Sequence, residues 1–396
     1  MDMKTHLSIL KPILSCLIIL ISGPATESIA AQTWQLRPTL SVSETYNSNI
    51  FSNTNETEDF ITGIGANINT TYSGTNTELQ ANYTATWNSY ANYPELNVVT
   101  HDGRINIDMA RWFSRYFRGI RISVSEDFSY TPDLRDYYYD AEREGSASLS
   151  NYGIRTGRDD SFRNAASINM RFPLSQNQDM SLRYSNLLTE FSDPELADNM
   201  TNILSIGTSY TTRQDTLYGD IGIRNSMLDE VDVNSHFITT GLRHRFSPAT
   251  QGEFSVGGDM IDSGAGYTSS LRGGLRFSKT SEFITYHIGY SRELNTVSGV
   301  STSPVVSQTA FINMSVTHTR QFSSNIGATY TINQSLNGDD VDIKSYNVSA
   351  GAIYAMRTWL TGSVSISHFV QDSEVTSEQD IERNLIMFKV AASWDT

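Results

Sequence analysis

The sequence predicts an all-β protein, a transmembrane up-and-down antiparallel β-barrel of about 18 strands. Three observations lead to this prediction. Apolar and polar residues alternate in segments of about ten to thirteen residues from Trp34 to the end of the chain. Short turns and longer polar loops take turns between these segments, and both ends of the series lie on the short-turn side. Bacterial outer-membrane barrels have this wiring, with short turns facing the periplasm and long loops facing outside.

The last segment, residues 384–394, has the clearest alternation. Successive side chains of a strand point to opposite faces, so residues of one parity form one face. One face here is apolar and ends in an aromatic residue near the expected membrane interface. Its members are Ile386, Phe388, Val390, Ala392 and Trp394.

The remaining segments repeat this pattern upstream. A long interruption at 132–160 contains a weakly alternating stretch, 146–151, which would form a short hairpin or extend a strand. The glycine pairs 257–258 and 273–274 lie inside predicted strands and would mark bends or bulges. The predicted strands are 34–48, 60–72, 77–91, 98–110, 119–130, 162–172, 179–190, 199–211, 216–228, 235–246, 251–261, 267–277, 282–294, 307–319, 324–336, 343–355, 359–370 and 380–394.

The composition agrees with a sheet that is apolar on one face and wet on the other. Hydrophobic residues make up 38% of the 396 residues, below the usual level for a globular domain. A soluble β-sandwich would need Greek-key crossovers and an apolar face on both sheets, and a solenoid would show one fixed short period. Neither pattern is present.

The N-terminus is typical of a secretory signal peptide. Lys4 and Lys11 form a basic region, residues 12–23 an apolar run, and cleavage is expected after Ala30 or Ala31. The apolar run is too short for a transmembrane helix. We therefore expect a signal peptide at 1–30 and a barrel at 31–396. Cys16 is the only cysteine, so the mature chain would have no thiol chemistry and no disulfide.

The formal net charge of −15 argues against nucleic acid as a partner, because phosphate binding needs clustered cations. Most acidic residues lie in the predicted external loops, as in 133–144 and 193–198. One interpretation is a solvated rim. The other is a rim that holds divalent cations against lipopolysaccharide or selects what enters the barrel.

The polar faces of the strands contain arginine. In residues 360–370 the apolar set would face lipid, and Thr361, Ser363, Ser365 and Ser367 would face the lumen. A charge at the lipid midplane costs a few kcal/mol, so the strand arginines should point inward. Eighteen strands enclose an interior wide enough for water. The predicted lumen-facing residues are Arg121, Arg183, Arg224, Arg243, Arg245, Arg272 and Arg276.

The sequence indicates no catalytic site, no metal site and no cofactor. The histidines of the mature chain have no metal-ligand spacing with another His or Cys. His244, between two arginines, is best interpreted as a structural interfacial residue. Three consecutive aromatic residues of the longest loop would either stack on sugar rings at the mouth or belong to an aromatic girdle. They are Tyr137, Tyr138 and Tyr139.

Two short motifs resemble a known family. Ser48-Asn-Ile-Phe51 followed by Glu58-Asp-Phe-Ile-Thr62, and the ending Glu382-Arg-Asn384 with its alternating strand, resemble the β-barrel porins associated with exopolysaccharide and exosortase (PEP-CTERM) gene systems. The resemblance runs over the whole mature chain, although this chain ends in Trp-Asp-Thr rather than in a terminal Phe. It implies an outer-membrane conduit that works with polysaccharide synthesis and secretion, and it supplies no catalytic residues.

These observations predict an integral outer-membrane protein of a Gram-negative bacterium that exports a secreted exopolysaccharide without chemistry. Inward arginines and hydroxyls would hydrogen-bond a hydrated polymer, acidic chains included. The alternatives are a general small-solute porin and an adhesin or scaffold whose loops do the work. The expected partners are outer-membrane lipid and lipopolysaccharide, the barrel-assembly machinery, polysaccharide and periplasmic export components.

Overall fold

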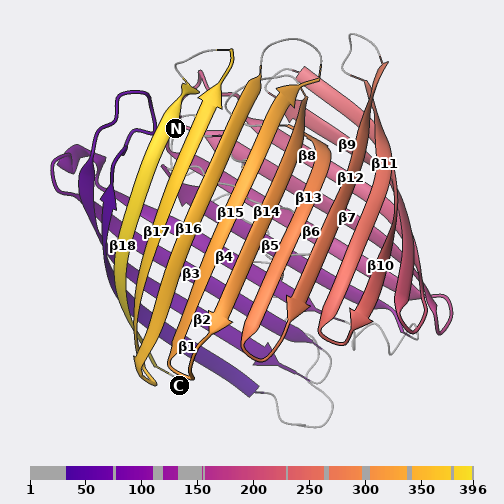
Figure 1. The fold of residues 1–396 in the computed structure, drawn as a ribbon, viewed down its shortest axis with the longest axis horizontal. Helices are drawn as coiled ribbons and strands as arrows, with labels where there is room; N and C mark the ends of the chain where they lie inside the picture. The colour runs from indigo at the N-terminus through magenta and orange to yellow at the C-terminus, as the bar shows by residue number, and fades with distance from the viewer. Residues whose placement is uncertain are drawn as a thin grey trace, which may run out of the picture.

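The computed structural model describes residues 33–74, 77–109, 119–132, 154, 157–228, 231–262, 267–296, 304–336, 341–375 and 379–394. These residues form one sheet of 18 antiparallel strands that closes on itself. The strands are strongly tilted, and the two halves of the chain make opposite walls of the ring (Figure 1). The predicted fold class is therefore confirmed.

Each predicted strand corresponds to an observed one, with ends that differ by at most four residues. One short 3-10 turn, η1 (Pro94–Leu96), is the helical element of the described residues, among which no helix is long and apolar enough to span a membrane. The strands are β1 (Thr33–Asn47), β2 (Asp59–Ser73), β3 (Glu78–Tyr90), β4 (Val98–Asp108), β5 (Arg121–Thr131), β6 (Ser161–Pro173), β7 (Gln178–Phe191), β8 (Asn199–Thr211), β9 (Asp215–Leu228), β10 (Val231–Ser247), β11 (Thr250–Asp262), β12 (Tyr267–Thr280), β13 (Ile284–Asn295), β14 (Val305–Thr317), β15 (Phe322–Ser335), β16 (Asp342–Arg357), β17 (Leu360–Ser373) and β18 (Ile381–Ser393).

The ring closes between the first and last strands. β1 and β18 pair antiparallel from Thr39 opposite Ser393 to Asn47 opposite Leu385. The backbone N–H of Trp394 donates to the carbonyl of Pro38 at 3.1 Å and continues this seam past the last strand. Closure gives the edges of the first and last strands a hydrogen-bonding partner, which a membrane-embedded sheet requires.

The two glycine pairs inside strands do not form bulges. Gly257, Gly258, Gly273 and Gly274 keep an unbroken register between β11 and β12. The register shifts instead between Arg245 and Ser247 and at the equivalent end of β16, both next to a short turn. The prediction of bulges at the glycines was therefore wrong, and the bulges lie at the rim, where a strand is easily re-aimed.

The outside of the barrel is apolar. Large apolar side chains of one parity are exposed on strand after strand, for example Leu271 at 63% on β12, Ile238 at 60% on β10 and Phe388 at 60% on β18. Residues directly opposite each other on paired strands share a face, so the register carries this assignment around the whole ring. In β17, Ile366 is outward and the neighbouring serines are inward.

A polar belt interrupts this apolar face near the long loops. Its residues point outward, and each lies three positions from the long-loop end of its strand. They bond one another or an outward neighbour across strands, as in Glu126–Asn164, Asn225–Asn234 and His368–Asn384 at 2.8–3.0 Å. Such pairing satisfies polar groups that would be costly in hydrocarbon. The belt comprises Glu44, Thr62, His101, Asn164, Asn202, Asn225, Asn234, Arg292, Gln308 and Asn384.

Replacing Ile366 with arginine should destabilise the folded barrel by about 2–4 kcal/mol, because it places a charge on the lipid side of β17 below the belt. Urea titration of the protein in lipid vesicles would measure the loss. Ser365→Arg is the matched control, because Ser365 is next to Ile366 on β17 and its side chain points inward. We expect its loss of stability to be several-fold smaller. Equal losses for both variants would contradict the assignment of the faces.

Candidate transport lumen

The register places all seven predicted arginines on the inner face, opposite in parity to the exposed apolar residues. Five of them belong to the neighbouring strands β9 and β10 and to β12, which β11 separates from β10, and Arg183 lies on β7. Arg121 lies at the short-turn end of β5, directly opposite Arg171 of β6. A role of these residues in binding cargo stays a prediction.

Carboxylates accompany the arginines inside the barrel. Arg183 Nη1 lies 3.2 Å from Asp220 Oδ1, although β8 separates their strands. Gly207 of β8 lies between them, and a Cβ at this position would come within 2.0 Å of Asp220 Oδ1. The glycine therefore leaves the space through which the aspartate reaches Arg183.

Glu253 of β11 is directly opposite two arginines, Arg243 on β10 and Arg276 on β12. The Nε and Nη2 atoms of Arg243 donate to its Oε2 at 3.1 and 3.0 Å. The hydroxyl of Tyr218 donates to Oε1 at 2.5 Å, and its ring crosses β10 above Gly241, where a Cβ would lie 2.4 Å from the ring. Gly241 thus leaves the space through which Tyr218 of β9 reaches Glu253 of β11.

Asp259 of β11 is a third inner carboxylate, with a fully buried side chain. The Nε atom of Arg272 lies 3.6 Å from its Oδ2. The central carbon of the Arg272 guanidinium, Cζ, lies 4.6 Å from the centre of the Phe237 ring, a distance that suits a cation–π contact. Arg272 is therefore held from two sides.

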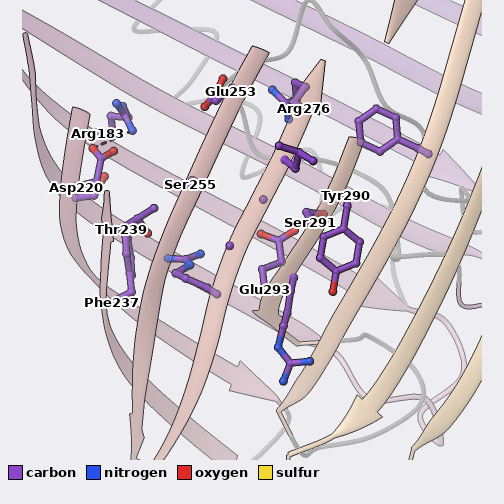
Figure 2. Close-up of a pocket in the computed structure, with 17 residues that line it drawn as sticks. Arg183, Asp220, Phe237, Thr239, Glu253, Ser255, Arg276, Tyr290, Ser291 and Glu293 are labelled. Atoms are coloured by element: carbon purple, nitrogen blue, oxygen red, sulfur yellow. Dashed lines mark ion pairs between the residues drawn. The ribbon is translucent and has the colours of Figure 1, made fainter. Parts of the chain in front are cut away.

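Some of these groups, Arg183, Asp220, Glu253, Arg272 and Arg276, line a hollow in the inner wall with a volume of about 300 Å³. Figure 2 shows Arg183 and Asp220 pointing toward each other, and Glu253 close to Arg276. Phe237 and Phe311 add apolar surface, because each ring lies over a glycine of the neighbouring strand. The hollow offers charges of both signs beside aromatic surface, so it would suit a polar organic solute better than a simple ion.

Substituting Gly207 with alanine should shift ion selectivity modestly toward anions, by less than about twofold. The new methyl group would push the Asp220 carboxylate away from Arg183, whose charge would then face the lumen. Reversal potentials across a salt gradient in planar bilayers would measure the shift. Gly219→Ala is the control, because a Cβ there meets only Thr239 O at 3.7 Å. An effect of the control equal to that of Gly207→Ala would argue against this explanation.

Two described residues of the connection between β5 and β6 contact strands other than β5 and β6. Ile154, from the connection between β5 and β6, is fully buried against Val305, Val341 and Ile343. In the ring order, β14 and β16 lie eight and ten steps from β6, on the opposite wall. Ile154 therefore lies against the wall opposite β6. Near the end of the connection, Arg158 donates to the hydroxyl of Tyr90 at 2.6 Å, which fastens the segment to β3.

The connection between β1 and β2 folds over the mouth. Asn49 is buried, and its Nδ2 donates to the carbonyl of Glu382 at 3.0 Å. Arg383 of β18, itself buried, donates to Asn47 Oδ1 at 3.2 Å and to Ser52 Oγ at 3.4 Å. These contacts hold the start of the connection against the inner wall.

The other predicted features have different outcomes. Tyr137, Tyr138 and Tyr139, the 146–151 stretch and the signal peptide at 1–30 lie outside the described residues. His244 is outward, close to a short turn, with Nδ1 2.7 Å from Asp215 Oδ1. Among the described residues, no three His, Cys, Asp or Glu side chains gather as a metal site would require. The absence of catalysis stays a prediction.

The chain is similar in structure to several solved proteins. OccK2 (OpdF) of Pseudomonas aeruginosa has a TM-score of 0.49 at 7% identity, covering 91% of this chain and 98% of that one. OccAB3 of Acinetobacter baumannii gives 0.46 at 9%, over 92% and 99%. A loop L8 deletion mutant of OmpT, an outer membrane protein of Vibrio cholerae, gives 0.41 at 10%, over 92% and 100%. No protein-family model and no curated protein matches the sequence. At these identities the likeness concerns the fold alone.

The sequence reasoning missed the inner carboxylates, having placed the acidic residues mostly in loops. Asp220 has the same parity as Arg224, and Glu253 the same parity as Asp259, so alternation alone would have placed them on the inner face. Their pairing with arginines needed the register and the glycines between strands. The polar belt was missed as well, because only alignment of the strands brings its members to one depth.

Proposed function

We propose that this protein is a passive conduit in the bacterial outer membrane that exports a secreted polysaccharide. The observation that carries the proposal is the closed ring with an apolar outside and an inside of arginines, carboxylates, hydroxyls and amides. Such a ring isolates a hydrated interior from lipid. The assignment of a polysaccharide as the cargo depends on the resemblance of the two sequence motifs to the porin family, and not on the geometry of the barrel.

The depth of the polar belt supports the membrane location. Asn202 of the belt lies nine residues from the short-turn end of β8 at Thr211. With a strand rise of about 3.3 Å and a tilt of about 40°, this spans about 23 Å along the barrel axis. Outer-membrane barrels have an apolar band of about 25 Å. The belt would then lie at the outer interface, where lipopolysaccharide is the expected neighbour.

The general small-solute porin remains a second candidate, because the hollow beside Arg183 and Phe237 would also suit small polar molecules. Deleting the gene separates the two. Export of polymer predicts loss of the surface polysaccharide and its accumulation in the periplasm, restored by the intact gene. A general porin predicts normal polymer and slower uptake of small solutes.

The conduit itself can be tested on the purified protein. We expect ion conductance in planar bilayers from the intact chain or after deletion of residues 132–160. No conductance from either protein would refute a conduit of any kind. Binding of cells or surfaces that is lost on changing the loops, with conductance unchanged, would favour the adhesin or scaffold instead.

A further inference from the structure

Charge is unevenly distributed around the inner wall. Across β14, β15, β16 and β17, all fully described, no inward position holds Asp, Glu, Lys, Arg or His. The inward side chains are mostly hydroxyls, amides and glycine. We call this surface the neutral track. Its central members are Asn313, Asn325, Asn347, Ser349, Ser363 and Ser365.

The opposite wall, β4 to β12, carries both charge signs in pairs. Arg104 lies 2.7 Å from Asp127 and Arg171 lies 2.7 Å from Asp179, in addition to the pairs of the three inner carboxylates described above. An acidic polymer would have to compete with these carboxylates for the guanidiniums that they pair with. The pairs therefore reduce the attraction that the arginines alone would exert on an anionic chain.

Two amides of the neutral track, those of Asn313 and Asn325, lie flat against the wall. A Cβ at Gly327 would meet Asn313 Oδ1 at 2.6 Å, and a Cβ at Gly351 would meet Asn325 Oδ1 at 2.7 Å. Each asparagine thus extends over a glycine of the next strand instead of projecting into the lumen. Donors and acceptors are thus spread over adjacent strands.

The track has no exposed aromatic platform. Its two inward aromatic residues, Phe311 and Phe369, are 5% and 3% exposed. Sugar rings could therefore form hydrogen bonds here but could not stack, and stacking is a major source of tight saccharide binding. A conduit needs such weak, repeated contacts, because cargo must leave as readily as it enters.

We propose that the neutral track binds an uncharged, hydroxyl-rich saccharide chain in preference to an acidic one. This inference rests on the proposed function and names its substrate class. A neutral chain exchanges hydrogen bonds to water for bonds to the serine and asparagine side chains as it moves. The charged wall holds the ion pairs and faces the chain across the water-filled lumen.

The experiment compares a neutral glucose oligosaccharide with a uronate oligosaccharide of the same length, using the full chain. Current blocks in planar bilayers give residence times, and saturation-transfer NMR on the detergent-solubilised protein gives binding without conduction. The test variant is Asn325→Ala/Ser349→Ala/Ser365→Ala. The control on the charged wall is Ser125→Ala/Ser167→Ala/Asn169→Ala, inward positions on β5 and β6.

We expect the neutral oligosaccharide to block longer than the uronate, and the test variant to shorten its blocks roughly threefold or more while the control leaves them unchanged. A longer uronate block would overturn the inference, as would neutral blocks that the test variant does not change. If the protein gives no current, saturation-transfer NMR on the same proteins tests the inference instead. Stronger signals from the neutral oligosaccharide, weakened by the test variant and not by the control, would support it, and the opposite result would overturn it. Normal surface polymer in the deletion strain would instead refute the export role and leave the saccharide preference standing.

Discussion

Replacing Asp220 with asparagine and Glu253 with glutamine together should make the channel anion-selective, raising the chloride-to-potassium permeability ratio roughly threefold or more. Both substitutions keep the side-chain size and remove two negative charges from the inner wall. Arg183 loses the negative charge that lies 3.2 Å from its guanidinium, and Arg243 faces a neutral amide in place of the carboxylate that accepts two of its hydrogen bonds. Reversal potentials across a potassium chloride gradient would measure the change, which should shrink at high salt.

The control for this double variant is Glu44→Gln/Glu126→Gln, which removes two negative charges from the outside of the barrel. Glu44 and Glu126 accept hydrogen bonds from Thr62 and Asn164 on the outward face, remote from the ion path. Their loss should leave the reversal potential unchanged. If the inner and outer variants shift it equally, the carboxylates of the lumen do not control selectivity.

Replacing Ile154 with aspartate should at least double the single-channel conductance, by analogy with removal of an obstruction from a water-filled pore. The side chain is fully buried among Val305, Val341 and Ile343, where an unpaired carboxylate is strongly disfavoured. The segment would leave the opposite wall and free part of the cross-section. Recordings in planar bilayers would report larger and noisier open currents.

Ile154→Val is the matched variant, because it keeps the apolar contact and should retain the original conductance. Folding of both variants can be checked by the shift in gel mobility on heating. A folded Ile154→Asp protein with unchanged current would show that this contact does not limit the path. Loss of folding would be distinguished by the absence of the mobility shift.

The strand order could be predicted because each strand carries its own signal. Alternation over ten or more residues identifies a strand that is wet on one side, and the lengths of the connections identify the two ends of the barrel. The inward side of Arg272 and Arg276 follows from parity once the apolar set is assigned to lipid. These are local properties of the chain, which a sequence displays directly.

The inner network could not be predicted, because it depends on contacts between strands. Asp220 meets Arg183 only because Gly207 lies between them, and Tyr218 meets Glu253 only across Gly241. A glycine in a strand shows that a side chain is missing there, but the sequence does not tell which side chain of another strand occupies the space. The burial of Ile154 on the opposite wall is equally invisible, since it joins segments about 150 residues apart.

The seam between β1 and β18 constrains how the molecule is made. Thr39 and Ser393 are 354 residues apart in sequence, yet their hydroxyls lie 2.9 Å from each other. Until the last strand is available, the first strand has no permanent neighbour on one side. The cylinder therefore cannot be completed before the whole chain is present, and even a small truncation at its C-terminal end would leave an open sheet rather than a slightly shorter cylinder.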